Sequence, residues 1–213
     1  MGALVNGFPP GDPAVLPTIE QLLQRYAEAL TPWAERAAAE MLSEVNRRDE
    51  TAWMQLSADL SRALRQEIRT APTGATMQAL MAEQVTLIKS IPLDAAQRVH
   101  RLTIEGIEDS TRASELSKAI RASGDVAKSR ADLIARTEVA RTASTLTEAR
   151  ALHVGSPGYF WRTSHDGDVR ASHKKMEGKF VAWDDPPTLD GMTGHAGQFP
   201  NCRCYPEPVI PED

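Results

Sequence analysis

Two cysteines, Cys202 and Cys204, stand one residue apart near the end of the sequence, and they are the only cysteines in 213 residues. A disulfide between them would close a very small ring, and their Cβ atoms would have to approach to about 3.8 Å, so we do not expect one. A redox role is typical of two cysteines separated by two residues beside a βαβ unit, which is not the pattern here. A metal site and a pair of reduced, buried thiols remain as interpretations.

Two histidines of the same region could complete a metal site. His173 and His195 each offer an imidazole nitrogen, and two thiolates with two imidazoles form a tetrahedral shell for Zn²⁺. The spacing is not that of a common zinc finger. Zinc binding by His173, His195, Cys202 and Cys204 is therefore a hypothesis beside the alternative of buried thiols, and no other cofactor is expected.

The same region also suggests a metal-dependent nucleic-acid-processing enzyme as an alternative function. A general base and metal ligands for such an enzyme could come from the His/Asp/Cys cluster, in particular from His165, Asp166, His173 and His195. The sequence holds no phosphate-cradling glycine motif and no nucleophile elbow. Nothing in the sequence fixes the geometry that such a site needs, so we expect no catalytic residues.

Three further residues of this region have structural interpretations. We expect Arg170 to pair with a carboxylate that ties a strand end to the next turn, and Asp166 is the nearest candidate in sequence. Gly178 suits a turn that requires a positive φ.

The secondary structure predicted to position these residues changes from helix to strands and turns near residue 154. Before it, apolar residues recur at steps of three or four, which predicts helix almost throughout residues 18–153, with breaks at 70–76, 90–92 and 124–125. On these helices Trp33 and Val139 are expected to face the core. After it, glycine and proline become frequent, and residues 159–164 and 179–183 are predicted strands.

The predicted fold class is therefore α+β, with a mostly helical N-terminal region followed by a small C-terminal α+β module that carries a short sheet. We divide the chain into an extended or disordered arm (1–17), a helical partner-contact region (18–124) and a module (125–213) of a long helix and the α+β tail.

Composition and charge exclude some classes of protein. Hydrophobic residues make up 41% of the chain, and no run approaches the roughly 20 apolar residues of a membrane span. The N-terminus lacks the basic and apolar regions of a secretory signal. A net charge of −5 argues against a surface devoted to nucleic acid.

Several motifs follow one another in an order that identifies a family. They are Arg-Thr-Glu on a long helix (Arg136, Thr137, Glu138), a tryptophan in a strand (Trp161), Asp-x-x-Val-Arg-x-x-His (Asp166 to His173), a turn glycine (Gly178) and Asn-Cys-Arg-Cys (Asn201 to Cys204). Residues 133–205 thereby resemble the phage Mu F-like minor head protein family, also called the phage head morphogenesis family. One departure is His195-Ala196-Gly197, where many relatives have His-Pro-Gly.

The resemblance implies a structural, non-enzymatic minor head protein of a tailed phage or prophage, located in the virion head and, during assembly, in the host cytoplasm. It implies action near the portal and the packaged DNA, with the portal protein and the major capsid protein as partners, weak DNA contact at most and no membrane. In a module with a thin core, a bound metal would pin the C-terminal strand to the turn that carries His173.

Overall fold

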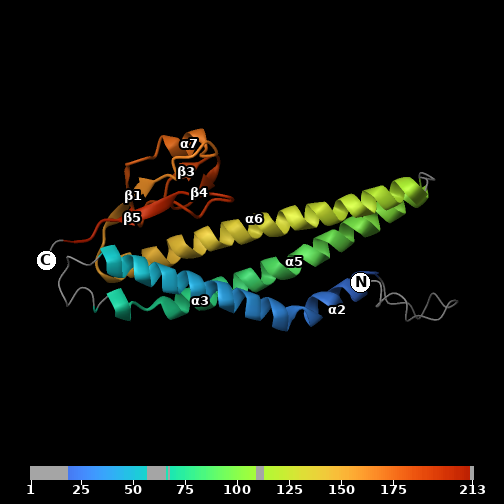
Figure 1. Cartoon of the computed structure of the whole chain (residues 1–213), viewed down its shortest axis with the longest axis horizontal. Coiled ribbons are helices and arrows are strands. Elements are labelled where there is room, and N and C mark those ends of the chain that lie inside the picture. Colours follow the sequence, from blue (N-terminus) through green and yellow to red (C-terminus); the bar gives the residue numbers. More distant parts are fainter. Residues whose placement is uncertain (1–18, 57–65, 67, 109–112, 212–213) are drawn as a thin grey trace. The chain divides into compact units, whose positions relative to one another are not determined.

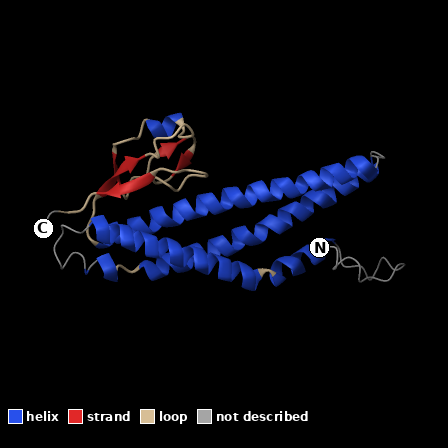
Figure 2. Cartoon of the chain, in the orientation of Figure 1, coloured by secondary structure: helices blue, strands red, loops and turns tan. Residues whose placement is uncertain are grey.

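The computed structural model of the chain describes residues 19–56, 66, 68–108 and 113–211 (Figure 1). The predicted arm, residues 1–17, lies outside these ranges. The long helices are α2 (Ile19–Ala29), α3 (Thr31–Leu56), α5 (Thr73–Glu108) and α6 (Ala113–His153). The described strands all follow residue 157 (Figure 2), so the predicted α+β class and the change of structure near residue 154 are confirmed. None of the described helices combines the length with the apolar character that a bilayer crossing requires.

Two of the predicted helix breaks are wrong. Helix α5 runs through Pro92, and α6 runs through Gly124. An interior glycine destabilises a helix by about 1 kcal/mol and a proline by about 3 kcal/mol. A long helix tolerates either residue when packing of the flanking turns offsets this cost. The break at 70–76 is confirmed in part, because Ala71 and Pro72 lie outside the helices and α5 begins at Thr73.

The chain forms two compact units, which we describe separately. Among the described residues, the first draws on 19–35, 85–108 and 113–131, and the second on 36–56, 66, 68–84 and 132–211. Within the first unit, Arg130 on α6 bonds to Asp94 on α5 at 2.6 Å and to the hydroxyl of Ser90 at 3.3 Å. The site described below lies entirely within the second unit.

The buried helix faces are offset from the predicted ones. Trp33 is 54% exposed, and the buried series on α3 begins one residue later with Ala34 and Ala38. Val139 on α6 is also exposed, whereas the polar Thr142 and Arg150 are buried. Apolar periodicity alone could not predict this face, because its burial depends on polar partners from distant segments.

Those partners are in α3 and α5. Asp49 of α3 accepts a hydrogen bond from Arg150 Nε at 2.7 Å, and both side chains are almost fully buried. Gln84 of α5 donates to the hydroxyl of Thr142 at 2.9 Å. These bonds give hydrogen-bond partners to polar groups of α6 that would otherwise oppose its burial against α3 and α5.

A three-stranded antiparallel sheet with strand order β2-β1-β5 follows α6. Its strands are β1 (Gly158–Arg162), β2 (Phe180–Ala182) and β5 (Tyr205–Pro208), and a separate hairpin pairs β3 (Thr188–Leu189) with β4 (Met192–Thr193). The two predicted strands are confirmed as β1 and β2. Strand β5 was not predicted, because two of its four residues are proline and proline is tolerated in a sheet only at edges.

The core of the second unit joins the sheet to helical residues. Tyr159 and Trp161 lie on the inner face of β1 and are completely buried, with Trp53 and Ile68 from the helical part in the same apolar cluster. Cys202 and Cys204 belong to this cluster as well. The cysteines are therefore surrounded by the core of the module rather than by solvent.

Candidate metal centre

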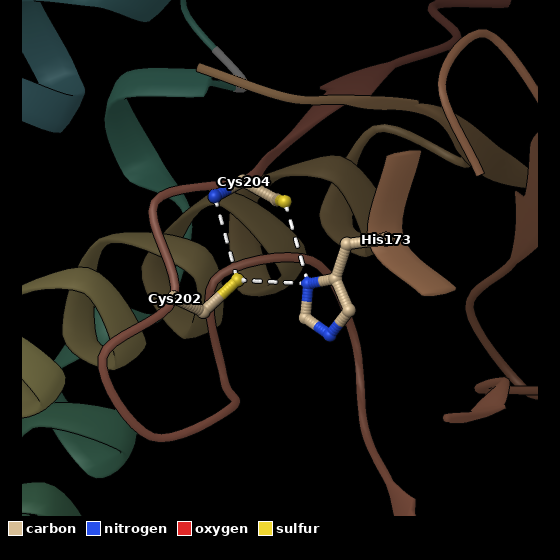
Figure 3. Close-up of side chains that lie close together, drawn as sticks. All are labelled: His173, Cys202 and Cys204. Atoms are coloured by element: carbon tan, nitrogen blue, oxygen red, sulfur yellow. Dashed lines mark hydrogen bonds between the residues drawn. The ribbon is translucent and has the colours of Figure 1, made fainter. Parts of the chain in front are cut away.

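His173, Cys202 and Cys204 form a buried cluster (Figure 3). Nδ1 of His173 lies 3.5 Å from Sγ of Cys202 and 3.5 Å from Sγ of Cys204. The three candidate ligand atoms lie within 4.8 Å of one another. Both cysteines are free thiols, and each of the three residues is at most 5% exposed.

The short helix α7 (Ala171–Lys174) presents His173 to the cysteines, and Arg170 directly precedes it. The guanidinium of Arg170 donates to the backbone carbonyl of Pro200 at 2.7 Å, which ties α7 to the segment before Cys202. The predicted pair of Arg170 with Asp166 is wrong. Asp166 instead accepts from Arg203 at 2.9 Å, because Arg203 stands between the two cysteines and reaches the carboxylate from the other side of the turn.

The segment that carries the cysteines is held against α6. The backbone amide of Asn201, which has φ +54°, donates to the hydroxyl of Thr137 at 2.9 Å. Gly197 has φ +91°, and a Cβ there would lie 3.1 Å from the carbonyl oxygen of Cys204 and 3.2 Å from that of Ala140. Only glycine suits this position, because both the backbone conformation and the close approach exclude a side chain.

Hydrogen bonds give the two cysteines different acidities. The pKa of Cys202 is lowered to about 5, chiefly because its sulfur accepts a hydrogen bond from the thiol of Cys204, and amides of Cys204 and Gly197 add to this effect. The pKa of Cys204 is raised, because its thiol donates that bond and is buried. The hydrogen bond between the two sulfurs therefore lowers the pKa of one cysteine and raises that of the other.

His195 does not belong to the cluster. Its Nδ1 lies 3.2 Å from the hydroxyl of Tyr159, and its Nε2 lies 3.8 Å from a carboxylate oxygen of Glu148. Burial lowers the pKa of His195, which favours a neutral imidazole. The predicted four-residue site is therefore reduced to three, since the aromatic packing that holds His195 directs it toward Tyr159 and Trp183 instead.

The residues suggested for a nucleic-acid enzyme lie in different surroundings. The side chain of His165 is 71% exposed and lies 3.7 Å from Glu177. Asp166 is engaged by Arg203, while His173 faces the cysteines. The folded chain therefore does not assemble His165, Asp166, His173 and His195 into one catalytic group.

The other motif residues support the cluster from around it. The ring of Trp161 packs edge-to-face with His173 at a centroid distance of 5.5 Å. Gly178 has φ +72°, as predicted, and its amide donates to the carbonyl of Trp161 at 2.8 Å. Glu138 is buried on α6, and desolvation raises its pKa. Arg136, by contrast, is exposed.

Two residues near the cluster were missed from the sequence. Phe199 packs edge-to-face with the ring of His173 at 4.9 Å, and Pro200 contributes the carbonyl that Arg170 binds. An apolar ring and a backbone oxygen carry no sequence signal of a site. A cavity of about 1210 Å³ adjoins the cluster, and Cys202, Cys204 and Arg136 are among the residues that line it.

The chain matches one known protein family. Residues 97–206, slightly more than half of the chain, match the family model described as Phage Mu protein F like protein. This range contains the long-helix motif, strands β1 and β2, the first half of β5 and the whole His173–Cys202–Cys204 cluster. No solved structure gives a significant match.

Two curated relatives match shorter parts of much longer proteins. An uncharacterized protein of Haemophilus influenzae is 32% identical over 134 residues, which is 63% of this chain and 29% of the relative. A protein of Enterococcus faecalis named NAD(+)–arginine ADP-ribosyltransferase EFV is 30% identical over 129 residues, which is 55% of this chain and 26% of that protein. The chain thus spans less than a third of the length of either relative.

Proposed function

Since the chain belongs to the phage Mu protein F-like family, whose members are associated with head morphogenesis, we propose that it is a minor head protein of a tailed phage or prophage that acts near the portal. The match over residues 97–206 carries this proposal. The arrangement of the second unit supports it, because the family motifs on α6, in β1 and in the cysteine segment converge on one module. Such a module is suited to a structural role.

A structural role also agrees with how the polar residues are used. Arg170 donates to the carbonyl of Pro200, and Arg203 donates to the carboxylate of Asp166. Both bonds hold turns in place. The alternative of a nucleic-acid enzyme loses its support, because its residues lie apart. We do not extend the transferase activity in the name of the Enterococcus relative to this chain, since the match covers only 26% of that protein.

The proposed partners are the portal protein and the major capsid protein. The long helices provide the extended surface that such contacts need, and exposed apolar side chains such as Trp33 and Val126 lie on them. Aromatic residues are enriched at protein interfaces, which favours α3 as a contact element.

Contact with the packaged DNA is proposed to be weak. The net charge of −5 opposes a broad phosphate-binding surface. Any binding that rests on a few phosphate contacts should fall by orders of magnitude between about 50 and 200 mM salt. Affinity that persists at the higher salt would contradict this part of the proposal.

The experiment for this role uses the portal and major capsid proteins of the phage or prophage that encodes the chain. The full-length chain is immobilised, and each of the two proteins is passed over it separately, with the portal of an unrelated phage as the control. Specific capture of the cognate portal would support the proposal. Disruption of the gene should then lower the yield of normal heads, and restoring the gene in trans should recover it. Normal heads without the gene, together with no capture, would overturn the proposal.

A further inference from the structure

We propose that His173, Cys202 and Cys204 bind one Zn²⁺ ion as its three protein ligands, with a water molecule in the fourth position. The ion would join α7 to the segment before β5 and so cross-link two segments of the module. This inference concerns metal binding by the chain itself and goes beyond its proposed role in the head.

The distances between the ligand atoms match a tetrahedral zinc site. With zinc bonds of about 2.3 Å to sulfur and about 2.0–2.1 Å to nitrogen, a tetrahedral angle places the two ligand atoms about 3.6 Å apart. His173 Nδ1 lies 3.5 Å from each sulfur. These two distances suit one ion, and all three candidate ligand atoms lie within 4.8 Å of one another.

Hydrogen bonding by His173 alone does not engage both sulfurs equally. A neutral imidazole nitrogen has either one lone pair or one hydrogen, so Nδ1 can form one good hydrogen bond with a thiol and leaves the other sulfur without it. A cation at the centre of the three atoms interacts with both sulfurs and the nitrogen at once. The backbone amide of Cys204 also donates to Sγ of Cys202 at 3.4 Å, a contact that stabilises a sulfur ligand carrying negative charge.

The surrounding structure holds the ligands in position before metal arrives. The rings of Trp161 and Phe199 each pack edge-to-face with the His173 ring. The bond from Arg170 to Pro200 connects the histidine helix to the cysteine segment. A site whose ligands are fixed in this way binds metal without a large ordering cost.

The ligand types select the metal. Thiolate and imidazole favour Zn²⁺ over Ca²⁺ and Mg²⁺, which take oxygen ligands. Cys202 and Cys204 are among the residues that line the adjoining cavity. His195 is not a ligand in this proposal, because Tyr159 and Glu148 face its two ring nitrogens.

The test measures metal on the purified full-length chain, isolated with reductant and then saturated with zinc or, without oxygen, with cobalt. We expect about one metal per chain, and cobalt absorption bands typical of a tetrahedral site with thiolate ligands. X-ray absorption of the zinc form should show two sulfur and two nitrogen or oxygen neighbours. A wild-type chain that binds neither metal would overturn the proposal, as would cobalt bands typical of an octahedral site.

Five variants, three at the ligands and two controls, separate the three-ligand site from the four-residue alternative. His173→Gln, Cys202→Ser and Cys204→Ser should each weaken zinc binding at least about tenfold. His195→Gln, a buried control in the same module, and His165→Gln, an exposed control, should retain wild-type affinity. If a ligand variant fails to fold, protection of the two thiols from alkylation in wild-type protein gives a second measurement, and zinc should slow their modification. Equal losses in His173→Gln and His195→Gln would overturn the three-ligand assignment. Because metal content is measured on the isolated chain, its failure would leave the head role standing, and the reverse also holds.

Discussion

The hydroxyl of Thr137 on α6 accepts a hydrogen bond from the backbone amide of Asn201, with 2.9 Å between the two atoms. The two residues are 64 positions apart, and each belongs to a different motif of the family. The bond therefore links the long-helix motif to the cysteine motif, since it holds Asn201 and the cysteines that follow it against α6.

Replacing this support should weaken the module modestly. Thr137→Val keeps the shape of the side chain and removes the acceptor, and we expect a loss of about 0.5–1.5 kcal/mol in the free energy of unfolding. The lower part of that range is favoured, because the bond lies in an exposed region where water can replace the hydroxyl. Urea unfolding measures the change, with Thr145→Val on the same helix as the matched control. Equal effects of the two substitutions would show that the bond to Asn201 contributes nothing of its own.

The buried ion pair of Asp49 and Arg150 should matter far more than the exposed pairs of Arg203. Arg150→Met leaves the Asp49 carboxylate buried without its cation, and we expect a loss of about 3–5 kcal/mol. Arg203→Met makes the same change at a side chain that is 53% exposed, and about 0–1 kcal/mol is expected. Denaturant unfolding of both variants provides the comparison. Losses of similar size would mean that the two pairs are equally solvated, contrary to the structure.

Gly158 is required for strand pairing. A Cβ at this position would lie 2.3 Å from the carbonyl oxygen of Val181 and 2.6 Å from the ring of Phe180, both in the adjacent β2 segment. Gly158→Ala should therefore destabilise the module by about 1–3 kcal/mol through overpacking. Gly167→Ala serves as the control, because nothing lies within 4 Å of its Cβ position. Thermal unfolding of both variants tests this, and a Gly158→Ala chain as stable as the control would contradict the described β1–β2 register.

The stability of the module should fall in mildly acidic solution because of His195. Burial lowers the pKa of this histidine in the folded chain, whereas in the unfolded chain it titrates near its usual value of about 6.5. As the pH falls below that value, the unfolded chain takes up a proton that the folded chain resists, so the free energy of unfolding decreases until the folded-state pKa is passed. Glu148 and Tyr159 face the ring of His195, and the substitution of His195 described next leaves both residues in place.

His195→Gln should remove this part of the pH dependence. Urea unfolding of wild-type and variant chains between about pH 5.5 and 8 measures it, and the wild-type free energy should decline more steeply toward acid. His165→Gln, which alters an exposed histidine, should follow the wild-type curve. Parallel curves for the wild type and His195→Gln would show that the folded chain protonates His195 as readily as the unfolded chain does.

Much of the fold follows from sequence pattern, and the exceptions have identifiable physical causes. Periodicity predicted the long helices and two strands correctly. It placed Trp33 of α3 and Val139 of α6 in the core wrongly. For α6 the reason is that its buried face depends on Asp49 and Gln84, which lie in other helices. The proline-rich β5 escaped prediction, since its place at a sheet edge depends on tertiary pairing.

The candidate site was predicted in part. The sequence identified His173, Cys202 and Cys204, because thiols and an imidazole are unusual enough to be conspicuous. It could not separate His173 from His195, since the choice depends on which aromatic residues surround each ring. It also paired Arg170 with its sequence neighbour Asp166, whereas the fold brings the carbonyl of Pro200 closer.

The central claim is that the chain is a component of the phage head, and quantitative mass spectrometry of purified procapsids and mature heads tests it most directly. We predict that the protein is present in both, at a constant ratio to the portal protein and far below the major capsid protein. Particles from which the protein is absent at both stages would contradict the account.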